Sequence, residues 1–133
     1  MAITPMASLW ARTGLIYFVA TMIFGLYIGI TGQFGASSPH AHLGLLGWLS
    51  SIAFAVIHTL ADPAGQKRAI GRVHWVLHNI GVIVHATALW LTIRGGEMGM
   101  FIGLGGLIII IATLIFIASI WGRLGSRAGD GQA

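Results

Sequence analysis

The chain has 133 residues, of which 56% are hydrophobic and 8% are charged, and its formal net charge is +4. Because soluble domains carry about 25% charged residues, this composition excludes a water-soluble globule and predicts a single transmembrane domain. The few basic residues form no stripe that could follow a phosphate backbone, so nucleic-acid binding is not expected. The lack of cysteine excludes disulfides, iron–sulfur clusters and covalently attached heme.

Four apolar runs predict an all-α fold, a bundle of transmembrane helices in contact with the lipid bilayer. Each run is close to the roughly 20 residues that cross a hydrocarbon core, and the short connections predict antiparallel neighbours. The first run is interpreted as a retained helix and not as a signal peptide, because almost no charge precedes Arg12. The Gly-rich residues 122–133 are predicted to form a flexible tail. The predicted helices cover residues 14–30, 41–60, 73–93 and 100–121.

The basic residues predict the orientation of this bundle. They gather in the loop after the second helix and near the two termini, which lie on one side of a bundle with an even number of helices. The positive-inside rule therefore predicts cytoplasmic termini for a multi-pass protein of the bacterial inner membrane. The five tryptophans are expected mainly in the interfacial belts. The residues that set the orientation are Arg12, Lys67, Arg68, Arg72, Arg123 and Arg127.

The histidines are the most informative residues, because ionisable groups inside a membrane are costly and suggest a functional site. All of them lie in the second and third predicted helices or, for His40, directly before the second. With about 3.6 residues per turn, His74, His78 and His85 fall on one face of the third helix. Folding the hairpin about its loop predicts an outer group at the periplasmic level and an inner group at the cytoplasmic level. The outer group is His40, His42 and His85; the inner group is His58 and His74, with His78 above them.

Neutral imidazole is an axial ligand for heme iron and also binds copper or zinc. We predict that His42 and His85 ligate a heme iron, and that His40 is a second ligand or belongs to a second heme site. His74 and His78 are further candidates for cofactor binding. At the inner level, His58 and His74 could instead hydrogen-bond to water or lipid headgroups, and His58 is therefore left out of the predicted ligand set.

The segment PHAHLGLLGW at residues 39–48 resembles the His-x-His segment of the catalytic subunit of heme-copper oxidases and bacterial nitric oxide reductases. In that subunit the first histidine binds the high-spin heme and the second binds the low-spin heme, which implies these roles for His40 and His42. The chain also resembles a group of small four-helix proteins that carry a similar helix followed by one like VHWVLHNIG at residues 73–81.

The chain departs from the large oxidases in ways that limit this resemblance. It has far fewer helices, and its tyrosines, Tyr17 and Tyr27, both lie in the first helix and outside any His-x-x-x-Tyr pattern. Its acidic residues, Asp62, Glu97 and Asp130, lie outside the predicted spans. Proton-pumping oxygen reduction by this chain alone is therefore not expected, and whether it is an enzyme stays open.

The sequence thus favours a heme b protein that transfers electrons to a redox partner or binds a diatomic gas such as nitric oxide or oxygen. A copper-binding protein that uses the same imidazoles, and a structural or assembly subunit of a respiratory complex, are the alternatives. We also expect a homo-oligomer, a trimer or a dimer, because a bundle of this size encloses a heme poorly. The approximate threefold symmetry of the oxidase subunit that the chain resembles implies the trimer. Candidate contacts are Gly25, Gly29, Gly103 and Gly106.

Overall fold

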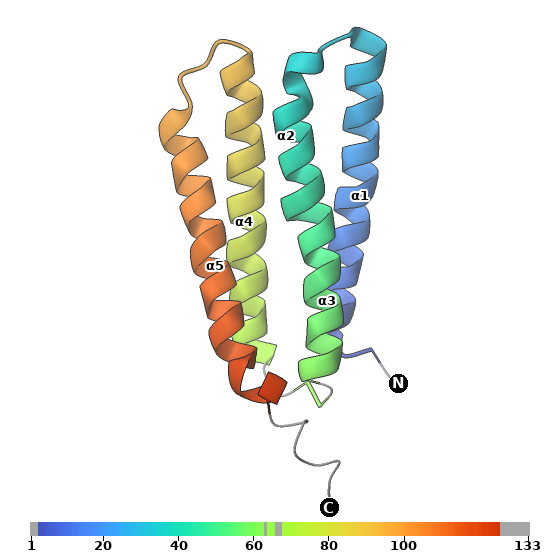
Figure 1. Cartoon of the computed structure of the whole chain (residues 1–133), viewed down its shortest axis with the longest axis vertical. Helices are drawn as coiled ribbons and strands as arrows, with labels where there is room; N and C mark the ends of the chain where they lie inside the picture. The colour runs from blue at the N-terminus through green and yellow to red at the C-terminus, as the bar shows by residue number, and fades with distance from the viewer. Residues whose placement is uncertain (1–2, 63, 66–67, 126–133) are drawn as a thin grey trace, which may run out of the picture.

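The computed structural model describes residues 3–62, 64–65 and 68–125, and these form an antiparallel bundle of helices without strands (Figure 1). Within these residues four helical spans are long and apolar enough to cross a membrane, which indicates a multi-pass membrane protein and confirms the predicted fold class. The second span is one helix in three parts, preceded by a 3₁₀ turn. The elements are α1 (Pro5–Thr31), η1 (Phe34–Ala36), α2 (Ser37–His42), the π-helical η2 (Leu43–Leu49), α3 (Ser50–Ala61), α4 (Arg68–Ile93) and α5 (Gly99–Gly125).

The spans are arranged as two hairpins, one made of α1 and the α2–η2–α3 helix and the other of α4 and α5 (Figure 1). The beginning of α1 and the end of α5 lie at the same end of the bundle, which we call the terminal end. The turns from α1 to α2 and from α4 to α5 lie at the opposite end, the loop end. The predicted antiparallel order of neighbours is therefore confirmed.

The first helix begins at Pro5, well before the predicted residue 14. The Thr4 side chain accepts a hydrogen bond from the Ala7 N–H at 3.2 Å, and the proline occupies the first turn, where its missing N–H costs nothing. The helix ends at Gly32, whose φ of 66° is the left-handed conformation that favours glycine. An apolar run marks only the stretch suited to lipid, whereas these capping residues set the ends of the helix.

The last helix continues to Gly125, so the prediction of a flexible tail is wrong for residues 122–125. The uninterrupted backbone hydrogen bonding of α5 carries its last turn beyond the apolar run. The rest of the predicted tail, residues 126–133, lies outside the described residues, as do two of the orienting charges, Lys67 and Arg127.

The hydrophobic core lies in the terminal half of the bundle. Trp10 from α1, Phe54 from α3 and Phe116 from α5 pack together there, with exposed fractions of 0%, 8% and 4%. The expectation of an interfacial position is therefore wrong for Trp10, because its face of α1 is turned toward the other helices. Large aliphatic side chains such as Ile30, 76% exposed, cover the outside of the bundle, as lipid contact requires.

Glycines allow the helices to approach closely at particular points. A Cβ atom at Gly105 of α5 would lie 2.6 Å from the backbone nitrogen of His85 on α4. A Cβ atom at Gly25 would lie 2.9 Å from the His40 ring. By contrast, no described atom lies within 4 Å of the Cβ position at Gly29 or Gly103, so these two candidate oligomer contacts have no packing role within the described part of the chain.

Candidate cofactor sites: a histidine pair and a histidine cluster

His42 from α2 and His85 from α4 lie side by side near the loop end, with their ring centres 4.9 Å apart and their planes tilted by 46°. They come from different hairpins and from positions far apart in the sequence. The structure therefore brings together the two residues that the sequence predicted as heme ligands, at the common level that folding the hairpin predicted.

Both rings of this pair are held in a defined tautomer by a backbone carbonyl. The Nδ1 atom of His42 lies 2.8 Å from the Ser38 carbonyl oxygen, and that of His85 lies 2.9 Å from the Ile102 carbonyl oxygen. A carbonyl oxygen can only accept a hydrogen bond, so each Nδ1 carries a proton, and in the neutral imidazole the lone pair is then on Nε2. Metal-ligating histidines are commonly oriented in this way through their second nitrogen.

Local helix geometry supplies the carbonyl for His42, and a contact between two helices supplies the one for His85. His42 bonds to the carbonyl of the residue four positions earlier, in the short α2 helix. His85 faces α5 where Gly105 and Gly106 leave room for its backbone and ring, and this close approach brings the Ile102 carbonyl within reach. In addition, Nε2 of His85 is buried and has no hydrogen-bond partner among the described residues, so its lone pair is available to a ligand.

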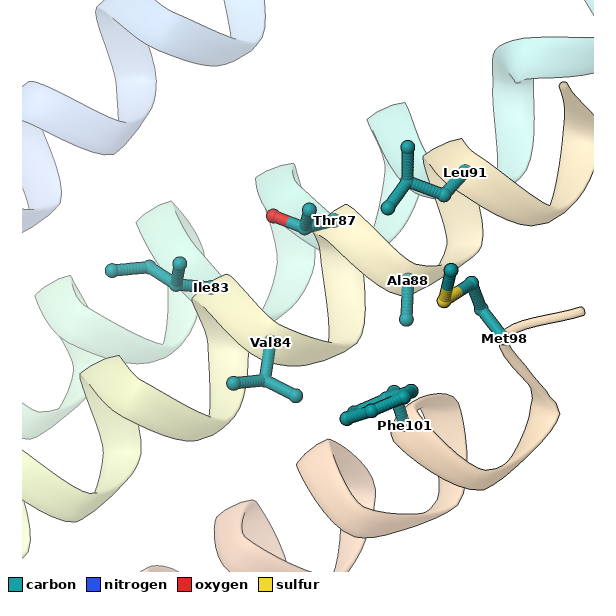
Figure 2. Close-up of a pocket in the computed structure, with 7 residues that line it drawn as sticks. All are labelled: Ile83, Val84, Thr87, Ala88, Leu91, Met98 and Phe101. Atoms are coloured by element: carbon teal, nitrogen blue, oxygen red, sulfur yellow. The ribbon is translucent and has the colours of Figure 1, made fainter. Parts of the chain in front are cut away.

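Apolar pockets surround this end of α4. One of about 290 Å³ is lined by Leu43 and Ala86, which directly follow the paired histidines in the sequence, and by Phe24 and Trp90. A second, of about 480 Å³, shares Phe24 and Trp90 and lies between α1 and α4. A third, of about 380 Å³, lies between α4 and the beginning of α5 (Figure 2). Its lining residues are Ile83, Val84, Thr87, Ala88, Leu91, Met98 and Phe101.

The two imidazoles and the apolar pockets suit a heme chemically, but the distance between the two ring centres is shorter than a shared iron requires. A metal–imidazole bond is about 2 Å long, so the ring centres of two histidines opposed across one metal lie roughly 6 Å apart. The ring centres of His42 and His85 are 4.9 Å apart, so the rings must separate by roughly 1 Å to ligate one iron from both sides. Since they belong to different hairpins, this separation would require one hairpin to shift against the other.

His40 is not part of this pair. Its ring packs against α1, over Gly25 and 6.0 Å from the ring centre of Phe24. Its Nδ1 atom is buried and has no hydrogen-bond partner within the described ranges. Because positions 40 and 42 of a helix point in very different directions, one ligand site cannot easily use both residues.

A second histidine group, which we call the terminal cluster, consists of His58 from α3 with His74 and His78 from α4. Each of these residues is 1% exposed. The ring centres of His58 and His74 are 6.4 Å apart, and those of His74 and His78 are 5.9 Å apart. Trp10 and Phe116 contact the His74 ring with centre separations of 4.7 and 4.8 Å, so all of the spans contribute to this cluster.

The π-helical segment η2 positions His78. The N–H of Ser50 bonds to the carbonyls of Leu45 and Gly47, whereas a regular α-helix would pair it with the carbonyl of Leu46. That Leu46 carbonyl oxygen instead accepts a hydrogen bond from Nε2 of His78, at 2.8 Å. His78 therefore keeps its lone pair on Nδ1, which is buried without a hydrogen-bond partner among the residues described.

The position of His58 corrects the expectation that it hydrogen-bonds to water or headgroups. Its ring is buried under α5, 5.3 Å from the ring centre of Phe116. The sequence does contain a signal for this burial, which the prediction missed. The helical spacing of Ser51, Phe54, Ala55 and His58 places the histidine on the buried face of α3. The partner carbonyls of the histidines were also missed, because only the tertiary structure brings Ile102 and Leu46 to them.

The described residues contain no group of three or more histidine, aspartate or glutamate side chains that could hold a metal ion. The predicted copper site would need His40, His42 and His85 to converge on one ion, and these three side chains do not converge in this part of the chain. A heme requires only one or two protein ligands, because the porphyrin supplies the others.

Comparisons with known proteins add no assignment: no protein-family model, curated protein or solved structure matches this chain.

Proposed function

We propose that the chain is a heme b protein of the membrane in which His42 and His85 are the axial ligands and electron transfer is the function. The observation that carries this proposal is the pairing of two imidazoles from different hairpins, each with its Nδ1–H bonded to a backbone carbonyl. Nε2 of His85 has no hydrogen-bond partner among the described residues. The apolar pocket lined by Leu43 and Ala86, the residues that follow the two histidines in the sequence, supports it, because a porphyrin needs an apolar surface.

The protein residues have separate tasks in this proposal. A heme held by His42 and His85 would supply one-electron redox chemistry. The carbonyls of Ser38 and Ile102 fix the orientation of the two rings and raise the basicity of the ligating nitrogens. Phe24 and Trp90, which contact each other with ring centres 5.2 Å apart, line the neighbouring pocket and would offer the porphyrin an apolar contact surface.

With both axial positions taken, electron transfer is favoured over gas binding. Nitric oxide, oxygen or carbon monoxide would need one histidine to leave the iron. We expect that carbon monoxide will not change the absorption spectrum of the reduced protein. A carbon monoxide spectrum in the wild-type protein would favour the alternative function, diatomic gas binding.

The absorption spectrum of the purified protein tests the proposal. The protein, expressed with a heme precursor in the medium, should carry non-covalent heme with a Soret band and sharp bands on reduction. His42→Ala and His85→Ala should each remove or convert most of this signal, because each loses an axial ligand. His40→Ala is the matched control and should keep it. Full heme occupancy in the His42→Ala protein would contradict the ligand assignment, and a wild-type protein that takes up no heme would contradict the function.

We further propose that both termini are cytoplasmic and that the membrane is the bacterial inner membrane. The support is the excess of basic residues near the termini and in the loop between α3 and α4. Reporter fusions after Ala133 and at Gly65 should report the cytoplasm, and a fusion at Gly35 should report the periplasm. A fusion at Ala133 that reports the periplasm would contradict the proposed orientation.

Homo-oligomerisation, as a trimer or a dimer, stays a prediction. It is supported by the large apolar outer surface and by the open space around Gly29 and Gly103, where a second copy could pack closely. Native mass spectrometry from a mild detergent, under conditions that retain heme, measures the state. A monomer loaded with heme as the only species would refute the prediction.

A further inference from the structure

The terminal cluster buries polar atoms that need a partner. Both ring nitrogens of His58 and both of His74 are buried and have no hydrogen-bond partner within residues 3–62, 64–65 and 68–125. Nδ1 of His78 and Nε1 of Trp10 are also buried without a hydrogen-bond partner among these residues. A buried polar group left unsatisfied costs about 1–3 kcal/mol, so the concentration of such atoms in one place indicates that the cluster holds a ligand.

The separation of two rings in this cluster matches that of two imidazoles on one metal ion. The ring centres of His58 and His74 are 6.4 Å apart, with their planes tilted by 35°. Bonds of about 2 Å from one metal to both rings require roughly 6 Å between the ring centres. Unlike the His42–His85 pair, which must open to ligate one metal, this pair already has the required spacing.

The surroundings select a small cation with few ligands. Zinc sites are nearly always tetrahedral, and no third or fourth histidine or carboxylate converges on this pair in the described part of the chain. The side chains of Trp10, Phe54 and Phe116 pack directly against His74, so a porphyrin would have to displace them. A cuprous ion, by contrast, is a d¹⁰ ion that accepts two nitrogen ligands in a near-linear arrangement.

Charge and aromatic contacts favour the same ion. A single positive charge costs less to bury than the double charge of zinc or cupric ion. Trp10 and Phe116 pack against His74, with ring centres 4.7 and 4.8 Å from that of the imidazole, so an ion bound to His74 would lie near aromatic rings, which attract cations. The Asp62 carboxylate, one turn beyond His58 and ion-paired with Arg123, adds a negative charge near the cluster.

We propose that His58 and His74 form a buried two-imidazole site for a monovalent d¹⁰ metal cation, Cu(I), at the terminal end of the bundle. His78 is a further candidate donor, because its ring centre lies 5.9 Å from that of His74 and its Nδ1 has no hydrogen-bond partner among the described residues. The site does not depend on the heme proposal, since His74 and His85 lie roughly 16 Å apart along α4 at about 1.5 Å per residue. Because His58 belongs to one hairpin and His74 to the other, the bound ion joins the hairpins and stabilises the folded bundle.

Anaerobic titration with Cu(I) against a chromophoric chelator tests the site. The full-length protein carrying both His42→Ala and His85→Ala is used, so that no heme bound by that pair contributes. We expect one ion per chain and a higher unfolding temperature with the ion bound. Adding His74→Ala or His58→Ala should lower the Cu(I) affinity by more than roughly 100-fold. Loss of a residue that only hydrogen-bonds to a metal ligand costs up to about that factor, and loss of a ligand should cost more. Adding His40→Ala, a histidine outside the cluster, should leave the affinity unchanged.

A second measurement needs no change in the cluster. X-ray absorption of the Cu(I) complex, with wild-type cluster residues, should show two nitrogen neighbours in a near-linear arrangement and no sulfur. Sulfur scattering, which would indicate Met6 or another methionine as ligand, overturns the assignment. So does binding that is unchanged by His74→Ala, or the absence of binding to this protein. The heme spectrum of the wild-type protein decides the other proposal and is independent of all these outcomes.

Discussion

The two histidine sites differ in how their imidazoles are satisfied. In the His42–His85 pair each ring donates to a backbone carbonyl and is partly exposed. The residues that follow these histidines, Leu43 and Ala86, line an apolar pocket. In the terminal cluster His58 and His74 are 1% exposed and have no hydrogen-bond partner among the described residues. An imidazole fixed by a carbonyl next to open apolar space suits a large flat cofactor. An imidazole enclosed by aromatic rings has room only for something small.

Among the substitutions that should affect one histidine site and not the other, Gly105→Ala is expected to have the largest effect. The added Cβ atom would lie 2.6 Å from the His85 backbone nitrogen and 2.9 Å from its Cα, so α5 must move away from α4. Overpacking of this kind costs about 1–3 kcal/mol, and the shift also pulls the Ile102 carbonyl away from His85. Thermal unfolding in detergent and heme absorbance should both decrease, whereas Cu(I) binding should persist.

Gly103→Ala is the matched control for this change. No described atom lies within 4 Å of its Cβ position, so stability should change by less than about 0.5 kcal/mol. A large loss at Gly103 would show instead that this face contacts a second copy of the chain. Equal losses at both glycines would contradict the assignment of the α4–α5 contact to Gly105.

A smaller effect, confined to the terminal end, is expected from Asp62→Asn. Asp62 is 2% exposed and forms an ion pair with Arg123 across the ends of α3 and α5. Hydrogen bonds to charged groups contribute about 1.5–3 kcal/mol, and Arg123 is partly exposed, so we expect a loss near the lower value. Unfolding temperature and Cu(I) affinity should decrease while the heme spectrum stays unchanged.

The exposed carboxylate of Glu97, in the turn before α5, provides the control for Asp62. Glu97→Gln should leave both unfolding and Cu(I) affinity unchanged. If it destabilises the protein as much as Asp62→Asn does, the effect reflects net charge and not the ion pair at the terminal end.

The smallest effect is expected from Tyr17→Phe, which acts between the two sites. The Tyr17 hydroxyl donates to Oδ1 of Asn79 at 2.9 Å and links α1 to α4. Side-chain hydrogen bonds between membrane helices contribute about 0.6 kcal/mol on average, so a loss of that size is expected without a change in either ligand site. Tyr27→Phe, at an exposed hydroxyl that accepts from Gln33, should be silent in the same unfolding measurement.

The sequence by itself determined the number of spans, their antiparallel order and the common level of His42 and His85. These follow from hydropathy, loop length and a constant rise per residue, which are local or additive properties. Hydropathy did not determine the start of α1, because that start is set by the Thr4 cap and by Pro5 in the first turn and not by apolar residues.

Only the tertiary structure decided which histidines have partners. Whether the Ile102 carbonyl reaches His85, or the Leu46 carbonyl reaches His78, depends on the close helix approach at Gly105 and on the π-helical turns of η2. The burial of His58 likewise depends on Phe116, from a helix far away in the sequence. Contacts between distant segments are set by how whole helix faces pack against one another, and the pattern of a single helix does not contain that information.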